Sequence, residues 1–183
     1  TKEKFLWVQD TINIPIRTKR PFTAPFTVVS DIVRDERCSN HFITVTSRKS
    51  YNNYGAAPPT KDVVRFQYDC DKKTVFYRTA DQDLPNTQTV KCNNMGRFHV
   101  TISVQNERLV FSDGRCNDIA VSSPFPSGTP LYLYIGANHN EPNVQSKFYS
   151  FQVMGRMTFK MPKGAVMKDD FTQYDDWFVR MWT

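Results

Sequence analysis

The sequence has no long apolar run. Nowhere in its 183 residues do apolar side chains continue for the ~20 positions that a membrane-spanning helix needs. No basic segment followed by an apolar one, the pattern of a secretory signal peptide, stands at its start. Helical periodicity is weak throughout, and its best candidate is a short turn from Lys168 to Tyr174. We therefore expect no membrane span and almost no helix. The chain begins at Thr1, and we expect it to be a processed or excised segment.

Close cysteine pairs are missing too. The four cysteines, Cys38, Cys70, Cys92 and Cys116, never form a C-x-x-C pattern, which argues against a thioredoxin-type motif and most structural zinc sites. Cys38 and His41 make one C-x-x-H pair, but a zinc site needs about four ligands, so we expect no metal. An even number of widely spaced cysteines favours two disulfides over four buried free thiols.

Two disulfides imply an oxidising compartment, and we therefore expect the protein outside the cell or on the cell surface. The sequence has no N-x-S/T site, so the usual mark of a secreted eukaryotic surface is absent. Four cysteines allow three pairings. We predict that Cys38 pairs with Cys70 and Cys92 with Cys116, because each pair joins neighbours in the sequence.

Positive charge is in excess but is dispersed. The chain has 24 Lys and Arg against 18 Asp and Glu, a formal net charge of +6, which first suggests an anionic partner. The charges occur in small groups, and no basic helix or RNP-type aromatic motif supports a nucleic-acid partner. A solvated surface accounts for most of them, and the group Arg17, Lys19 and Arg20 is a candidate contact for sulfated glycan or phosphate.

What the sequence has in abundance is alternation of apolar and polar residues. Aromatic residues reach 14% of the chain, and aromatic and β-branched residues favour strands. The segment 25–34 is apolar on both faces for part of its length, which predicts a central strand. About ten to a dozen strands at spacings of ~8 to 15 residues are typical of a two-sheet sandwich. The predicted strands and hairpins are 11–17, 25–34, 41–48, 63–78, 97–111, 131–135 and 148–153.

Three segments, "GRFHVTISVQNERLVFSDGRC", "PLYLYIGANHN" and "KFYSFQVMG", resemble the second half of concanavalin A-like jelly rolls, the superfamily of laminin G-type, galectin and legume-lectin domains. The resemblance covers Gly96 to Gly155, and "TINIPI", "PFTVVSDI" and "HFITVTS" fit the first half more loosely. It implies an all-β, two-sheet antiparallel sandwich, formed as a single domain over residues 1–183. Residues 160–183 are then a C-terminal extension that packs on the sandwich or on a partner.

Departures from these families limit the functions that the resemblance implies. The chain lacks the H-x-N-P-R strand and the W-G-x-E segment of galectins, so galactoside specificity does not follow. Glucanases on this sandwich place paired acids on one strand, whereas the dense acids here do not alternate with apolar residues. The three histidines have no spacing to a serine or cysteine that identifies a catalytic site. We expect a protein that is not an enzyme. The dense acids are Asp169, Asp170, Asp175 and Asp176.

The loop between Gly136 and Ser146 is the candidate ligand site. Amide side chains suit sugar hydroxyls, because each offers two donors and an acceptor in one plane. The alternative is that these residues only form the turn. Asp113, beside Gly114, is a candidate calcium ligand or simply part of a turn, and no other cofactor is expected. The candidate loop residues are Asn138, His139, Asn140 and Asn143.

Two functions remain open on the sequence. The first is a non-catalytic, extracellular, lectin-like module that binds glycan or a protein partner. The second is a structural subunit of an extracellular filament, coat or capsid, in which the jelly roll packs against copies of itself or neighbouring domains. Large apolar side chains near both ends of the chain favour this second function, because they need a partner surface. They are Trp7, Trp177 and Trp182.

Overall fold

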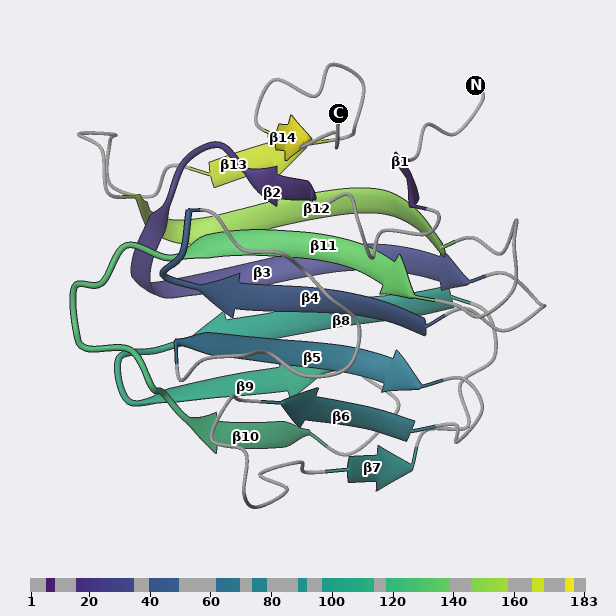
Figure 1. The fold of residues 1–183 in the computed structure, drawn as a ribbon, viewed down its shortest axis with the longest axis horizontal. Helices are drawn as coiled ribbons and strands as arrows, with labels where there is room; N and C mark the ends of the chain where they lie inside the picture. Colours follow the sequence, from purple (N-terminus) through teal and green to yellow (C-terminus); the bar gives the residue numbers. More distant parts are fainter. Residues whose placement is uncertain are drawn as a thin grey trace.

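Strands from the whole length of the chain pair into two antiparallel sheets that pack face to face in the computed structural model (Figure 1). These strands confirm the all-β, two-sheet antiparallel sandwich that the sequence predicts. No helix within the described ranges could span a membrane. The structure describes residues 6–8, 16–34, 40–49, 62–69, 74–78, 89–91, 97–113, 118–138, 146–157, 166–169 and 177–179.

Sheet A has seven strands among the described residues. Its middle is the long antiparallel pair β12 (Ser146–Met157) and β3 (Phe22–Arg34). On the far side of β3 follow β8 (Arg97–Val104), β9 (Arg108–Ser112) and β10 (Ile119–Ser122). The other edge of β12 pairs with β1 (Leu6–Val8) and with β13 (Val166–Asp169).

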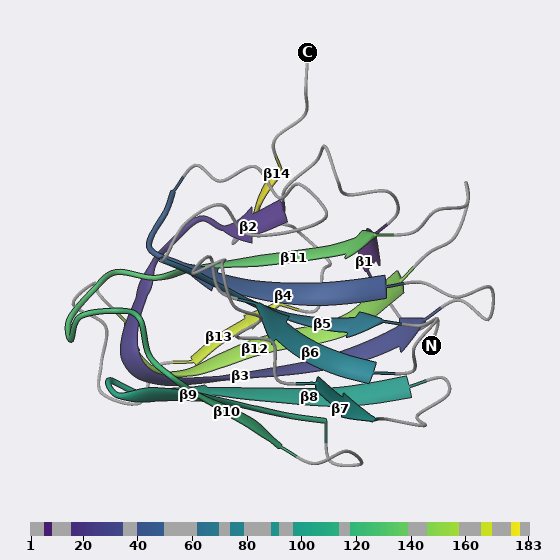
Figure 2. The same cartoon turned by 60° about the horizontal axis from the view of Figure 1, so that its bottom comes forward.

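Sheet B also has seven strands within the described part of the chain, and Figure 2 shows it as a layer separate from sheet A. In spatial order its strands are β14 (Trp177–Val179), β2 (Ile16–Thr18), β11 (Tyr132–Asn138), β4 (Asn40–Thr46), β5 (Val63–Asp69), β6 (Thr74–Arg78) and β7 (Thr89–Lys91).

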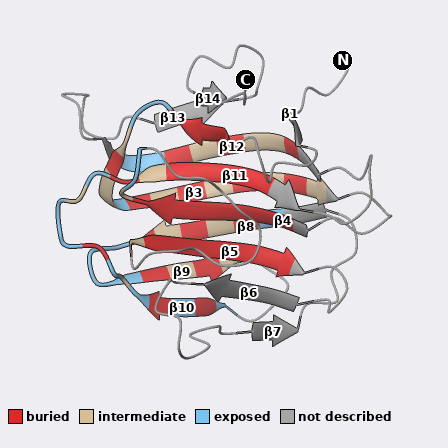
Figure 3. Ribbon diagram, in the orientation of Figure 1, coloured by how far each residue is buried: buried red, intermediate tan, exposed pale blue. Residues whose placement is uncertain are grey.

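The core lies between the two sheets, and the period-two alternation of each strand decides which side chains enter it. On β8, Val100 and Ile102 are at most 1% exposed, whereas Thr101 between them is partly exposed. Figure 3 shows buried residues along the strands of both sheets. The rings of Phe66, from sheet B, and Phe111, from sheet A, stack with centroids 5.0 Å apart. Full burial of a side chain of this kind stabilises the fold by about 1.5–3 kcal/mol.

Strand pairing agrees with the prediction at several points. The segment 25–34 is central, because β3 pairs with both β12 and β8. The two predicted hairpins are β5–β6, with Phe66 opposite Tyr77, and β8–β9, with Ile102 opposite Phe111. Of the predicted strand 11–17, residues 11–15 lie outside the described residues, and the last two residues belong to β2.

The C-terminal half departs from the prediction in detail. β11 continues past Ile135 to Asn138, and β12 begins two residues early, at Ser146. Since these strands lie in different sheets, the connection between them leads from sheet B to sheet A. Lys168, expected in a helical turn, lies in β13 opposite Gln152, because pairing with β12 supplies the hydrogen bonds that a short isolated turn lacks. Within the predicted extension 160–183, β13 and β14 are strands of sheets A and B.

A glycine allows β12 to pass close to β3. Gly155 has a φ of +138°, in the region that favours glycine. A Cβ at this position would lie 2.7 Å from the carbonyl oxygen of Pro25 and 2.8 Å from the Cα of Phe26. The pairing register of β12 with β3 shifts between Gly155 and Met157. The residue thus marks a bulge in the central pair of sheet A.

Candidate functional site

The outer face of sheet B carries a row of polar and aromatic side chains across four neighbouring strands. Arg17 of β2 pairs with Tyr134 of β11, Tyr134 pairs with Thr44 of β4, and Thr44 pairs with Arg65 of β5. Directly paired residues share one face of a sheet, and the core residues of these strands alternate with them. The row is buried, with exposures of 7%, 1%, 0% and 1% in that order.

Both arginines of this row rest on aromatic rings. The Cζ atom of Arg65 lies 4.5 Å from the centroid of the Phe42 ring, and that of Arg17 lies 5.1 Å from the Tyr132 ring. Arg17 also donates from Nη1 to the carbonyl oxygen of Thr18 at 2.7 Å. A contact between a cation and an aromatic ring contributes about 0.5–2 kcal/mol, with the larger values when the pair is desolvated. The guanidinium groups are therefore held in place rather than solvated and mobile.

The centre of this face is closed to solvent in the structure. The Oγ1 atom of Thr44 is buried and has no hydrogen-bond partner among the described residues. A buried hydroxyl without a partner costs about 1–3 kcal/mol. Val63 and Tyr134, 0% and 1% exposed, form a small apolar cluster on the same face, against which Tyr132 packs. A ligand arriving from solvent therefore does not meet the centre of the row first.

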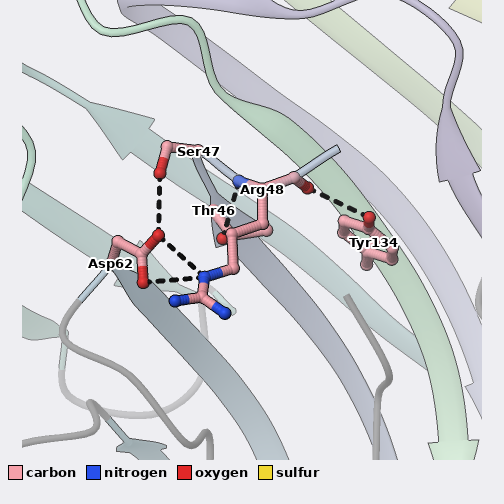
Figure 4. A network of polar contacts seen from close by, with 5 residues as sticks. All are labelled: Thr46, Ser47, Arg48, Asp62 and Tyr134. Carbon is pink, nitrogen blue, oxygen red and sulfur yellow. Dashed lines mark hydrogen bonds and ion pairs between the residues drawn. The ribbon is translucent and has the colours of Figure 1, made fainter. Parts of the chain in front are cut away.

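A polar network fixes one end of this face (Figure 4). The hydroxyl of Tyr134 lies 3.0 Å from the carbonyl oxygens of both Arg48 and Lys49, to which it donates. Arg48 Nε donates to Asp62 Oδ1 at 3.1 Å and Oδ2 at 3.0 Å, and Ser47 Oγ donates to Oδ2 at 3.0 Å. The network ties the chain that follows β4 to the neighbouring strand β11.

A second basic segment is tied to the other edge of β11. The backbone N–H of Leu133 donates to Thr18 Oγ1 at 3.3 Å. Leu131 and Phe22 exchange two backbone hydrogen bonds of 2.7 and 2.8 Å. The bend between Thr18 and Phe22, which holds Lys19 and Arg20, therefore runs alongside Tyr132.

We call this region the basic end of sheet B. Figures 1 and 2 both show the chain that leaves β4 rising past β11 towards β2. Four cationic residues here are exposed, namely Lys19, Arg20, Arg48 and Lys49. Tyr132 lies between them and is partly exposed, and Arg17, which stacks on its ring, is buried. The acidic side chain of Asp62 at this end is paired with Arg48 at 3.0 Å. The basic end comprises Arg17, Lys19, Arg20, Arg48, Lys49 and Tyr132.

Of the site residues predicted from sequence, the structure describes Asn138 and Asp113, which lie in or next to strands of different sheets. Asn138 is the last residue of β11 and pairs with Asn40, at the end of sheet B opposite to the basic end. Asp113 follows β9 in sheet A and is 3% exposed. Among the described residues, no group of three or more His, Cys, Asp or Glu side chains is arranged to hold a metal ion. His139, Asn140 and Asn143 lie outside the described residues, so the amide loop stays a prediction.

The structure describes the histidine of the C-x-x-H pair but none of the four cysteines. Cys38, Cys70, Cys92 and Cys116 all lie outside the described residues, so their pairing also stays a prediction. His41 is 4% exposed, and its ring stacks on Tyr68 with centroids 5.5 Å apart.

Sequence reasoning found half of the basic end. It singled out the Arg17 to Arg20 group but missed Arg48, Lys49 and Tyr132. A signal was available in "LYLY", where the period-two alternation puts both tyrosines on the face opposite the core leucines. No local signal shows that the segments after β2 and β4 lie at the same end of sheet B, because each is placed there by its own contacts with β11.

Comparison with known proteins supports the fold and nothing finer. No protein-family model matches the sequence, and no curated protein matches it significantly. Among solved structures, sheep galectin-11 in complex with glycerol is 12% identical, with a TM-score of 0.54 over 77% of this chain and 97% of that chain. A Bacillus subtilis protein of unknown function with a galectin-like fold is 9% identical, with a TM-score of 0.56 over 81% of each chain.

A third structure, CB05 from A. japonicus, is 10% identical with a TM-score of 0.58, over 88% of this chain but only 27% of that chain. Identities this low identify the fold alone. The chain has a galectin-like fold, which confirms the two-sheet antiparallel jelly roll that the sequence predicted.

Proposed function

We propose that this protein is a non-catalytic, extracellular carbohydrate-binding module whose ligand contacts the basic end of sheet B. The observation that carries the proposal is the setting of Tyr132. Arg17 stacks on its ring, Val63 and Tyr134 pack against it, and exposed cationic side chains stand on both sides. A rigid aromatic group ringed by N–H donors offers both apolar contact and hydrogen bonds, as sugars require.

Binding fits these residues better than catalysis. Glycoside hydrolysis uses two carboxyl groups about 5–10 Å apart on either side of the scissile bond. At the basic end, the carboxylate of Asp62 already accepts hydrogen bonds from Arg48 and Ser47. The acid–histidine pair of Asp31 and His99, 2.9 Å apart, lies on the outer face of sheet A, at a paired position of β3 and β8. The galectin-like fold also supports binding over catalysis.

The proposal is tested with a glycan array that covers neutral, acidic and sulfated glycans, with and without calcium, followed by calorimetry on the best ligand. Tyr132→Leu removes the aromatic group while keeping apolar volume, and we expect it to weaken binding at least tenfold. His99→Ala, on the outer face of the other sheet, is the matched control and should bind as the unmodified protein does. Absence of binding to every glycan class, with and without calcium, would refute the proposal.

A second candidate, the assembly subunit, is favoured by the outer face of sheet A. Thr27 pairs with Ser103, Val29 pairs with Thr101, and Val110 pairs with Ser103, and all five side chains are small, uncharged and partly exposed. A patch of uncharged side chains on the outer face of a sheet suits packing against another protein. Light scattering at high concentration distinguishes the two functions. Self-association that Val110→Lys abolishes would favour assembly, and a strictly monomeric protein would count against it.

A further inference from the structure

We propose that the basic end selects anionic glycans and binds their sulfate or carboxylate groups between two basic segments, one on each side of Tyr132. This inference rests on the proposed function, since it names the ligand class of the same site. The fold brings four exposed cationic side chains to this end of sheet B. They are Lys19 and Arg20 before β3, and Arg48 and Lys49 after β4.

The two basic segments are fixed to β11 by hydrogen bonds that do not use the charged groups of the two lysines. On one side Thr18 Oγ1 accepts from the N–H of Leu133. On the other, the Tyr134 hydroxyl donates to the backbone carbonyls of Arg48 and Lys49. The backbone is thereby positioned while the ammonium groups of Lys19 and Lys49 project from exposed residues. A site whose backbone is already ordered loses less conformational entropy on binding.

Charge at this end is one-sided within the described residues. Arg17, Lys19, Arg20, Arg48 and Lys49 all lie at this end, and the carboxylate of Asp62 is paired there with Arg48 at 3.0 Å. The whole chain has a formal net charge of +6. Cationic side chains that are separated in the sequence therefore lie at the same end of sheet B. Clustered charge of one sign raises the local concentration of an oppositely charged ligand and its association rate.

Two other anionic partners fit these observations less well. Single-stranded nucleic acid binds along a basic groove in which successive bases stack on several aromatic side chains, whereas the described residues of the basic end include one aromatic residue, the partly exposed Tyr132. A protein binds a membrane surface through basic residues together with apolar side chains that enter the lipid. The large apolar side chain that is exposed among the described residues, Met154, belongs to β12 of sheet A.

The test measures binding of a heparin-derived sulfated hexasaccharide and of the same hexasaccharide after complete desulfation and N-acetylation. Single-stranded RNA of equal charge and vesicles containing phosphatidylserine are measured in parallel. The variants are Lys19→Gln, Lys49→Gln and the double variant, since neither change removes a hydrogen bond that orders the backbone. Arg108→Gln is the matched control, because Arg108 is an exposed cation of β9 in the other sheet.

We expect the sulfated hexasaccharide to bind at least tenfold more tightly than its desulfated form. Each single variant should weaken it about threefold to tenfold, and the double variant should lower the slope of log affinity against log salt by roughly 1.5, at ~0.7–0.9 per neutralised contact. Arg108→Gln should leave the affinity unchanged.

Equal binding of both hexasaccharides, with no effect of the variants, would overturn this inference and leave the glycan-binding function intact. Failure to bind any glycan would overturn both. Tighter binding of RNA or vesicles, lost in the same variants, would confirm an anion site but refute the ligand class proposed here.

Discussion

Replacing Tyr134 by Phe tests whether the basic end is held in place by β11. The ring is 1% exposed and packs with Val63, and this contact survives in Phe. The substitution removes only the hydroxyl, which donates to the carbonyl oxygens of Arg48 and Lys49 at 3.0 Å. The segment that carries the two exposed cations Arg48 and Lys49 then loses this attachment to β11.

The expected cost to stability is small. A single hydrogen bond contributes about 0.5–1.5 kcal/mol net, and a carbonyl left without its donor near the surface regains water. One hydroxyl shared by two carbonyls counts as one donor, so we expect a loss of about 1 kcal/mol in the free energy of unfolding. For a domain of this size that corresponds to a decrease in Tm of about 2–4 °C. Loss of the whole side chain in Tyr134→Ala should cost about 3–5 kcal/mol.

Urea unfolding gives the stability, and calorimetry with the sulfated hexasaccharide gives the affinity. We expect Tyr134→Phe to weaken binding about threefold to tenfold while the protein remains folded at 25 °C. Tyr68→Phe changes a buried tyrosine of the core, 2% exposed, and is the control for the loss of a hydroxyl elsewhere. If Tyr134→Phe left both stability and affinity unchanged, the hydrogen bonds from Tyr134 to Arg48 and Lys49 would contribute neither to the free energy of unfolding nor to binding.

Three further predictions concern the fold itself. Gly155→Ala should destabilise the protein by at least about 2 kcal/mol in urea unfolding, because a sparsely populated backbone conformation such as φ +138° costs ~1–3 kcal/mol outside glycine and the new Cβ meets the backbone of Pro25; a loss under about 0.5 kcal/mol would contradict the close approach of β12 to β3. Thr44→Val should leave stability unchanged or raise it by up to about 1 kcal/mol, since it removes a buried hydroxyl without a partner among the described residues; a clear loss would show that the hydroxyl is bonded. Mass spectrometry of non-reduced peptides should find two disulfides, each of which stabilises the fold by about 3–4 kcal/mol. If alkylation under denaturing conditions instead finds four free thiols, the disulfide prediction is wrong and the main argument for an extracellular location is lost. The pairing we propose remains Cys38 with Cys70, which flank the neighbouring strands β4 and β5, and Cys92 with Cys116, which flank β7 and β10.

The sandwich could be predicted because alternation is a local property. In "RFHVTISV" every second residue is apolar, and the structure buries Val100 and Ile102 while Thr101 stays partly exposed. The strand ends could not be predicted as well. Asn138 favours turns by its side-chain chemistry, yet it belongs to β11 because pairing with Asn40 of β4 outweighs that preference.

The candidate site was harder to predict, because alternation assigns a residue to a face and does not say what covers that face. Arg65 stands between the core residues Val64 and Phe66 and reads as solvent-facing, yet it is 1% exposed over the ring of Phe42. The basic end has a second, non-local cause. Lys19 and Lys49 are far apart in sequence, and only the contacts of both segments with β11 bring them together.

Backbone amide chemical shifts in an NMR titration with the sulfated hexasaccharide test the central claim most directly. The account predicts that the largest shifts fall on residues 18–22, 47–49 and 131–134, while Val29 and Thr101 on the outer face of sheet A stay unchanged. Shifts confined to the outer face of sheet A, or to the predicted amide loop around His139, would contradict a binding site at the basic end of sheet B.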